Sequence, residues 1–169
     1  ARDHGVVAVI VLTNDISKNK PLIKAGFAIN GDDPLPFLDN FVGSVVNLPS
    51  IEAAASGVGS FNLSPETDGI IRRVPTFLRI GEKIYPSLSM EALRVFQGAS
   101  TYILKSSGAN LEENFGESTG LNHVKVGRLE IPVDGRGRFW VHFGADAPNR
   151  VIPLWKVFED DFDPASVAG

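Results

Sequence analysis

The residues with the clearest potential for chemistry lie in one segment, residues 59–75, with the sequence GSFNLSPETDGIIRRVP. An Asp-Gly pair that begins at Asp68 predicts a tight turn, and Arg72 and Arg73 then enter a strand. Because side chains alternate across a strand, the two guanidinium groups point to opposite faces, and an inward one needs an acidic partner such as Glu66 or Asp68. The segment therefore predicts a structural arginine clasp, or a site where the inward arginine binds an anion or carboxylate ligand.

Other residues lack the spacing that catalysis requires. The three histidines are His4, His123 and His142, and none has a second histidine or a carboxylate three or four positions away on a predicted helix. The chain has no cysteine, which excludes thiolate nucleophiles, thiolate zinc sites, iron–sulfur clusters and disulfides. No G-x-S-x-G elbow is present, and the glycines in residues 57–59 are followed by Asn62 where a dinucleotide fingerprint needs a third glycine. We therefore assign no catalytic residue and expect no cofactor.

Two acidic groups have the carboxylates that calcium prefers. One is the pair Asp32 and Asp33, and the other, near the C-terminal end of the sequence, is Glu159, Asp160, Asp161 and Asp163. Neither has the spacing of an EF-hand loop. We interpret both as solvated acidic loops and expect no bound metal.

The composition limits the class of protein. The chain has 169 residues, a formal net charge of −4, 43% hydrophobic and 21% charged residues, which is typical of a folded domain. The acidic balance argues against a general nucleic-acid binder, which needs a basic face. The longest apolar run, residues 6–12, is far shorter than the roughly 20 residues of a membrane span. No initiator methionine or signal peptide precedes this run, so we interpret the chain as part of a longer protein.

Hydrophobic patterning predicts the strands that position the arginines. Residues 6–12 are continuously apolar and predict a strand buried on both faces, which favours an α/β core. A short strand is predicted at residues 44–48. A longer one covers residues 70–80, with Pro75 at an edge or a bulge because proline donates no ladder hydrogen bond. Residues 83–85 are its hairpin partner.

Two helices and a β-meander complete the prediction. Ser50 is expected to cap a short helix over residues 51–55. Residues 86–97 are the clearest helix, and Gly98 suits its left-handed exit. Its apolar stripe is Leu88, Ala92, Val95 and Phe96. A short terminal helix is predicted over residues 153–158.

The meander is expected over residues 124–126, 129–133 and 138–143, with Phe139, Val141 and Phe143 on one face of the last strand. The fold class is thus α/β (α+β), with a mixed β-sheet flanked by helices and a C-terminal β-meander. We predict one domain over residues 1–158 and an acidic linker over residues 159–169.

Two blocks of sequence resemble a known family. The first runs from a glycine and an asparagine through Asp-Gly, two arginines and a proline to a Tyr-Pro-Ser-Leu helix start. In this chain its parts are Gly59, Asn62, Glu66, residues 68–75, residues 85–88 and residues 90–94. The second block contains residues 131–134, Gly137 and Arg138, and a strand that ends at Phe143. Together they resemble the CHASE2 family, the extracytoplasmic sensor domains of bacterial membrane-bound signalling receptors, over roughly residues 6–158.

The resemblance implies an architecture beyond this chain. A signal-anchor helix would precede the sensor, and transmembrane helices and a cytoplasmic effector would follow it. Residues 97–120 resemble the branch with adenylate or guanylate cyclase effectors, and a histidine or Ser/Thr kinase effector is the alternative. The family's N-terminal strand and Trp-Pro-rich stretch have no counterpart here, so we expect a truncated domain whose sheet lacks an edge partner or takes one from a second copy.

In this interpretation the domain itself is not an enzyme, although the full-length protein is one, a cyclase or a kinase. It lies on the periplasmic face of the inner membrane, tethered through segments absent from this chain. A small molecule or envelope component is its ligand, nucleic acid is not, and the full-length receptor is a homodimer. Asp68, Arg72 and Arg73 are the candidate ligand-binding or structural residues.

Two alternatives stay open at the level of the sequence. The chain could be a periplasmic solute-binding protein or enzyme, or a module that senses the envelope through protein contacts. A concave polar pocket beside Arg72 or Arg73 would favour a small ligand. A surface patch of Tyr102, Trp140 and Trp155 would favour protein contact.

Overall fold

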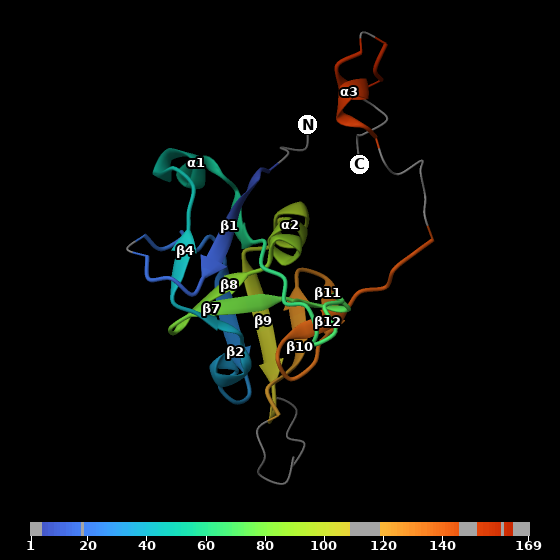
Figure 1. The fold of residues 1–169 in the computed structure, drawn as a ribbon. Helices are drawn as coiled ribbons and strands as arrows, with labels where there is room; N and C mark the ends of the chain where they lie inside the picture. Colours follow the sequence, from blue (N-terminus) through green and yellow to red (C-terminus); the bar gives the residue numbers. More distant parts are fainter. Residues whose placement is uncertain (1–4, 18, 109–118, 146–151, 160, 164–169) are drawn as a thin grey trace.

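The computed structural model describes residues 5–17, 19–108, 119–145, 152–159 and 161–163 (Figure 1). It has the mixed α/β architecture that the sequence predicts, with several mixed sheets. The strands are β1 (Val7–Thr13), β2 (Gly26–Asn30), β3 (Asn40–Phe41), β4 (Gly43–Val45), β5 (Gly57–Ser60), β6 (Arg73–Pro75), β7 (Phe77–Ile80), β8 (Lys83–Pro86), β9 (Thr101–Ser106), β10 (Leu121–Val126), β11 (Leu129–Pro132) and β12 (Arg138–Trp140). The helices are α1 (Pro49–Ala54), α2 (Leu88–Phe96), α3 (Leu154–Val157) and the 3-10 turn η1 (Leu35–Phe37).

The first sheet has the strand order β4-β1-β5, with β1 antiparallel to β4 and parallel to β5. The prediction that β1 is buried on both faces is wrong. Ile10 and Leu12 are buried, whereas Val9 and Val11 on the opposite face are 43% and 41% exposed. α2 lies on that opposite face but mainly over β5, so it leaves the valines of β1 partly uncovered (Figure 1).

A β-hairpin lies between two hydrophobic cores. β7 and β8 are antiparallel, as predicted, and turn at Gly81, which has a φ of +61°. Phe77 and Ile84 pack into one core, whereas Leu78 and Tyr85 pack into the other. The hairpin is therefore apolar on both faces, and β3 extends its sheet as a parallel neighbour of β7.

The single strand predicted over residues 70–80 is two strands, β6 and β7, separated at Thr76. The Thr76 N–H and hydroxyl both donate to the carbonyl of Gly137, at 2.8 and 2.6 Å. Pro75 ends β6 in the two-stranded β12-β6 sheet, so it lies on an edge strand, one of the two places predicted for it. The break lets β6 leave the hairpin sheet and pair with β12 instead.

A four-stranded sheet with the order β11-β10-β9-β2 contains the β-meander. β9, β10 and β11 are consecutive antiparallel neighbours, and β2 joins β9 in parallel. The third strand expected in the meander, within residues 138–143, is not part of it. Asp134 and Gly137 close a turn by a 2.7 Å backbone hydrogen bond, and Thr76 holds this turn, so β12 is directed to β6.

α2 begins at Leu88, later than predicted, because Pro86 still belongs to β8. Gly98 has a φ of +64° just after the helix, as its expected exit position requires. The predicted apolar stripe is wrong, since Ala92 is exposed and Phe96 is 78% exposed. The buried positions of the helix are Met90, Glu91 and Arg94.

The glycines of β5 explain why α2 buries polar residues and exposes apolar ones. A Cβ at Gly57 would lie 2.7 Å from Cγ of Glu91, and one at Gly59 would lie 2.7 Å from Cα of Leu88. Because β5 presents no side chains there, α2 approaches the strand closely and encloses its own polar residues.

The short helices also differ from the prediction. Leu48, not Ser50, is the N-cap residue of α1, and Pro49 occupies its first turn. Glu52 in that turn is buried and accepts hydrogen bonds from the backbone N–H groups of Leu22 and Asn47, both at 3.1 Å. α3 lies within the helix predicted over residues 153–158, and its residues are exposed.

Candidate functional site

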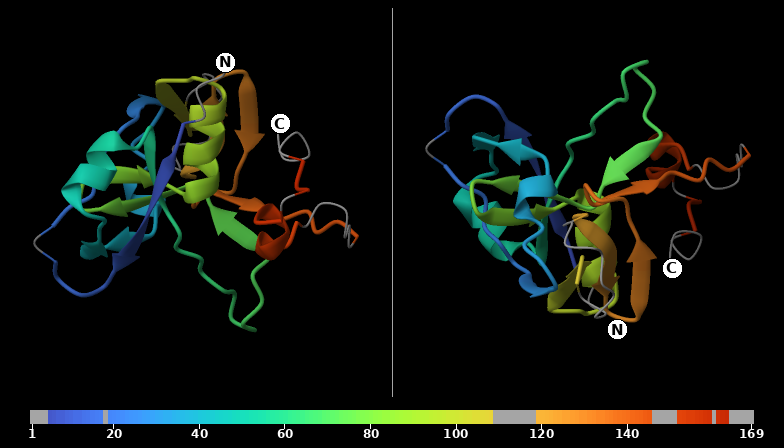
Figure 2. Two further views of the ribbon diagram at one scale, coloured as in Figure 1. Left: turned by 90° about the horizontal axis from the view of Figure 1, so that it is seen from above. Right: turned by 90° about the horizontal axis from the view of Figure 1, so that it is seen from below.

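The two arginines lie at the end of a long excursion of the chain. Residues 61–72 leave β5, extend away from the sheets and return as β6 (Figure 2). Gly69 has a φ of +81°, and its N–H donates to the carbonyl of Glu66 at 2.8 Å. The Ile70 N–H donates to Oδ1 of Asp68 at 3.0 Å. The predicted Asp-Gly turn is thus confirmed.

Both arginines bind acidic residues and form a clasp. Nη2 of Arg72 lies 2.7 Å from Oδ2 of Asp68, and its Nη1 lies 3.3 Å from Oε2 of Glu66. Nε of Arg73 lies 2.8 Å from Oε1 of Glu66, and its Nη1 lies 3.1 Å from Oδ2 of Asp134. The expectation of one exposed and one inward arginine is wrong, because their side chains are 37% and 26% exposed and share Glu66. β6 begins only at Arg73, so the alternation of a strand does not include Arg72.

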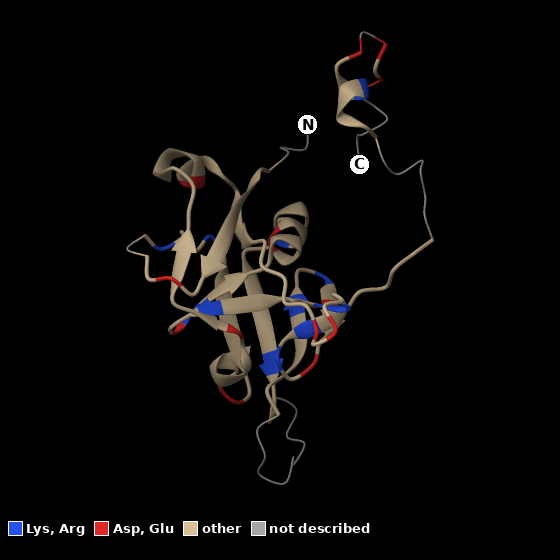
Figure 3. Cartoon of the chain, viewed as in Figure 1, with Lys and Arg blue, Asp and Glu red and all other residues tan. Residues whose placement is uncertain are grey.

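Asp134 is the clasp residue that the sequence analysis did not assign. Its Oδ1 accepts the backbone N–H groups of Arg136 and Arg138 at 3.1 and 3.0 Å, and its Oδ2 lies 2.9 Å from Nη2 of Arg138. Arg73, its other partner, also lies over the Trp140 ring, 5.2 Å from the centroid. The clasp therefore ties the β5–β6 segment to β12, where acidic and basic residues gather (Figure 3). The Asp-Gly turn at this position is visible in the sequence, but its contact with Arg73 is not.

The clasp keeps its carboxyl groups ionised. The hydrogen bond from Arg73 lowers the pKa of Glu66, and the hydrogen bond from Arg72 lowers the pKa of Asp68. Burial alone would raise the pKa of Asp134, but the hydrogen bonds from the backbone and side chain of Arg138 lower it. The same pairs raise the pKa of both arginines, which stay protonated. The site thus holds fixed, mutually compensated charges and no group suited to proton transfer near neutral pH.

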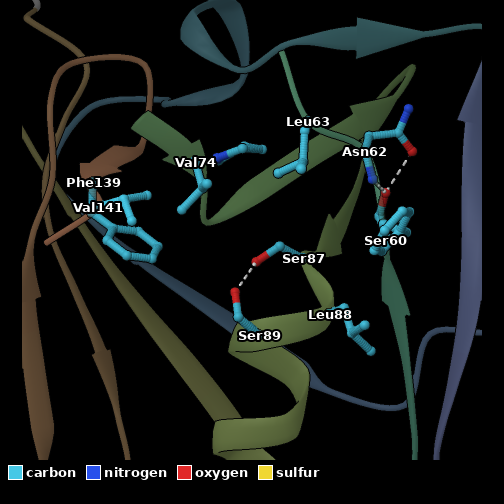
Figure 4. Close-up of a pocket in the computed structure, with 11 residues that line it drawn as sticks. Ser60, Asn62, Leu63, Val74, Ser87, Leu88, Ser89, Phe139 and Val141 are labelled. Carbon is cyan, nitrogen blue, oxygen red and sulfur yellow. Dashed lines mark hydrogen bonds between the residues drawn. The ribbon is translucent and has the colours of Figure 1, made fainter. Parts of the chain in front are cut away.

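A cavity of about 320 Å³ lies beside the clasp. Its lining comes from residues 60–63 at and after the end of β5, Val74 and Pro75 of β6, residues 87–89 at the start of α2, and Phe139 and Val141 in and after β12. Figure 4 shows Leu63 and Val74 on one side of the space, Phe139 and Val141 on another, and residues 87–89 facing them. Phe139 and Val141 share one face, as predicted. Neither Arg72 nor Arg73 is in the lining, which is mainly apolar, so this cavity is not the polar pocket beside the arginines that was named as the mark of a small-ligand site.

The polar atoms of the cavity come from serine and asparagine. The hydroxyls of Ser87 and Ser89 lie 3.2 Å apart and bond each other (Figure 4). The hydroxyl of Ser60 donates to Oδ1 of Asn62 at 2.7 Å. The Asn62 amide also bonds the backbone N–H and carbonyl of Leu12, at 2.7 and 2.8 Å, so it serves to fix β1 against the end of β5.

A buried ionic group lies on the inner side of α2. Glu91 is fully buried and accepts from Arg94 Nη2 at 2.7 Å, from the Tyr102 hydroxyl at 2.8 Å and from the Val58 N–H at 3.2 Å. Arg94 also donates to the carbonyl of Ser56 at 3.0 Å. Burial and the negative charge of Glu91 raise the pKa of Tyr102. Since every partner is satisfied within the fold, this group joins α2 to β5 and β9, and sequence patterning gave no sign of it.

The remaining sequence candidates are not brought together. His123 and His142 are exposed, and His4 lies outside the described residues. Asp33 accepts the Leu35 N–H at 3.0 Å at the start of η1. Within the described parts of the chain no three acidic or histidine side chains are placed to hold a metal ion, and Asp160 of the C-terminal acidic group falls outside those parts.

The aromatic patch is not formed as envisaged. Tyr102 is fully buried and stacks on Phe27, with ring centroids 5.4 Å apart. Trp140 and Trp155 are 57% and 61% exposed. Tyr102 therefore belongs to the core, and the two tryptophans alone remain on the surface.

Comparison with known proteins identifies the family. The family model of the CHASE2 domain matches residues 6–169. The chain belongs to the CHASE2 family. CHASE2 domains are extracytoplasmic sensory domains of signalling receptors and are not themselves catalytic units. Searches of curated proteins and of solved structures return no match.

The family assignment agrees with the resemblance carried by the two sequence blocks. The CHASE2 match includes both the clasp and the cavity, which lie within residues 60–141. In the described residues, no helix has the length and apolar character needed to cross a membrane. The division into a domain over residues 1–158 and a linker over residues 159–169 stays a prediction.

Proposed function

We propose that this CHASE2 domain is the periplasmic input domain of a membrane receptor and controls a cytoplasmic adenylate or guanylate cyclase. A ligand or partner would bind one conformation of the domain more tightly and so shift the population that the effector senses. The observation that carries the proposal is the CHASE2 match over residues 6–169, since this family supplies sensory domains to signalling receptors.

The geometry supports a sensory role. The cavity walls come from four segments that are distant in sequence, so a ligand there would contact all four at once. The clasp couples two of these segments, because Arg73 bonds Glu66 in the excursion and Asp134 beside β12. Val141 lies just after β12 and so on the segment that leads toward the C-terminal part of the chain. A conformational change in the cavity could therefore be transmitted along this segment to an effector that follows the domain.

The test uses the full-length receptor in a bacterium without a cyclase of its own. Cyclic AMP and cyclic GMP are measured for the wild type, for Arg73→Ala and for Arg128→Ala, an exposed arginine outside the clasp. We expect the wild type to form a cyclic nucleotide, Arg73→Ala to change the yield severalfold, and Arg128→Ala to match the wild type.

Two outcomes contradict the proposal. A receptor that forms neither nucleotide, but autophosphorylates in isolated membranes, supports the kinase alternative. A cyclase whose activity is unchanged in the periplasmic variants would show that the domain does not control it.

We also propose that the full-length receptor is a homodimer, in which membrane tethering raises the effective concentration of the two copies. Crosslinking of the receptor in membranes tests this point.

A further inference from the structure

The cavity between the excursion, α2 and β12 is built for a particular kind of ligand. We propose that it binds an uncharged, mainly apolar small molecule that carries one hydrogen-bonding group, an inference that rests on the proposed sensory function and specifies its ligand. At about 320 Å³, the cavity is at the lower end of the range for small-molecule sites, roughly 300–1,000 Å³. This volume suits one fused aromatic ring system or a short acyl chain.

The lining excludes a charged ligand. Among the residues that the structure describes, the lining includes no acidic or basic side chain, and most of it consists of leucine, valine, proline and phenylalanine side chains. The arginines next to the lining in sequence are Arg73 and Arg138, with Arg72 beside them, and all three are paired with Glu66, Asp68 or Asp134. A charged group in the cavity would lose its hydration without gaining an ionic partner, which is strongly unfavourable. Binding of an apolar group, in contrast, is favourable, because it displaces poorly bound water from the apolar walls.

The serine pair supplies the polar contact. When one of the two hydroxyls of Ser87 and Ser89 donates to the other, the second still has a proton to donate, and both keep free acceptor positions. The Asn62 amide is committed to Leu12 and Ser60, so the serine pair is the polar group that a ligand can address. One hydroxyl or carbonyl group on the ligand matches this pair.

The exposed rim of the cavity also favours an apolar ligand. Phe61 and Leu63 are 62% and 46% exposed, although both are large apolar side chains that line the cavity. A ligand that fills the space would cover them on one side and contact Phe139 and Val141 on the other. It would thereby bridge the two segments that the clasp joins at Arg73 and would hold them at a fixed separation.

The test is a titration of the 169-residue chain with 2-naphthol, a neutral bicyclic probe with one hydroxyl. Calorimetry should give a dissociation constant below about 1 mM. Naphthalene-2-sulfonate, which has the same rings and a negative charge, should bind at least about tenfold more weakly. Absence of 2-naphthol binding, or equal or tighter binding of the sulfonate, would overturn the proposal.

Variants locate the site. Val141→Phe fills the cavity and should abolish 2-naphthol binding, whereas the matched control Val45→Phe, at a 63% exposed position of β4, should bind as the wild type does. Ser89→Ala should weaken 2-naphthol binding about five- to tenfold and leave naphthalene binding unchanged, since only the hydroxyl contact is lost. If Val141→Phe does not melt cooperatively, Leu63→Ala at the exposed rim replaces it, with severalfold weaker binding expected.

Wild-type affinity in the cavity variants would overturn the assignment of the site. Equal losses for 2-naphthol and naphthalene in Ser89→Ala would overturn the role of the serine pair. These titrations do not involve the receptor's output. A receptor whose cyclic-nucleotide production ignores the domain would therefore contradict the proposed function while the binding result stands.

Discussion

Arg73 has a different structural role from its neighbour Arg72. Arg72 bonds Glu66 and Asp68, which belong to the same excursion, so it closes a local turn. Arg73 bonds Glu66 on one side and Asp134 on the other, so it joins two parts of the chain that are far apart in sequence. Of the two, we expect Arg73 to contribute more to the stability of the folded domain.

The clasp predicts a specific dependence of stability on pH. The pKa values of Glu66 and Asp134 are lower in the fold than in the unfolded chain. Their ionised forms therefore stabilise the fold above the ordinary carboxyl pKa of about 4, and this contribution disappears as the pH falls through the lowered values. Arg73→Ala should thus lower the melting temperature at pH 7, and the difference from the wild type should shrink in acid.

Thermal unfolding followed by circular dichroism between acidic and neutral pH measures this effect. Arg72→Ala is the comparison and should lose less stability than Arg73→Ala at pH 7. Wild-type melting temperatures in both variants would show that the clasp is not a stabilising device. A difference that stays constant across the pH range would show that the carboxylates are not its origin.

Glu91 and Arg94 predict a non-additive pair of substitutions. Arg94→Met would leave the fully buried Glu91 without its cation, which typically costs about 3–5 kcal/mol. For a chain of this length the melting temperature should fall by about 6–20 °C. Adding Glu91→Gln removes the unpaired charge, so the double variant should be more stable than Arg94→Met alone. Urea unfolding of the two single variants and the double variant measures the coupling, and strictly additive losses would contradict the interpretation.

At the scale of the elements, α2 shows which features of a helix the sequence pattern predicts and which it does not. Its location, its exit at Gly98 and the hairpin before it follow from local signals. Its buried face does not, because apolar periodicity points to Phe96, whereas Glu91 and Arg94 are buried. The cause is the glycine-lined face of β5, a neighbour that the helix sequence cannot reveal.

The strands show the same limit. β1 was predicted at the right place, but its burial depends on which part of the sheet α2 covers. The prediction of a strand at β12 is confirmed, but its predicted pairing with the meander is wrong. The turn at Asp134 and its contact with Thr76 decide the pairing with β6. For the site, the acidic partners Glu66 and Asp68 were predictable from proximity. Asp134 and the cavity required the tertiary fold.

Gly59 sets the distance between β5 and the start of α2. A methyl group at this position would lie 2.7 Å from Cα of Leu88, where the helix forms one wall of the cavity. Gly59→Ala should therefore lower the melting temperature and, by moving residues 87–89, weaken 2-naphthol binding. Gly144→Ala is the control, because in the described part of the chain no atom beyond the adjacent residues lies within 4 Å of its added methyl group. Titration and thermal unfolding of both variants provide the measurement, and a Gly59→Ala protein identical to the wild type would contradict close packing here.

For the whole molecule, the prediction of a mixed α/β fold is confirmed, but the meander consists of β9, β10 and β11 and does not include β12 as predicted. The three-layer order, with the β7–β8 hairpin between the β4-β1-β5 sheet and the four-stranded sheet, was not predicted. Continuous apolar runs show that a strand is buried, but they do not show that its two faces belong to separate cores. The resemblance to CHASE2 lies in two linked sequence blocks, and both blocks contribute residues to the lining of one cavity.

The position of the hairpin between two cores has a consequence for local motion. The hydrogen-bonded backbone amides of β7 and β8 should exchange with solvent deuterium only through opening of the entire domain, because either core alone keeps the hairpin closed. Hydrogen exchange followed by mass spectrometry should therefore give this segment the slowest rate in the chain. Faster exchange there than in β2, at the edge of its sheet, would contradict this. The hairpin then couples the two hydrophobic cores, so that local unfolding of one half of the domain requires unfolding of the other.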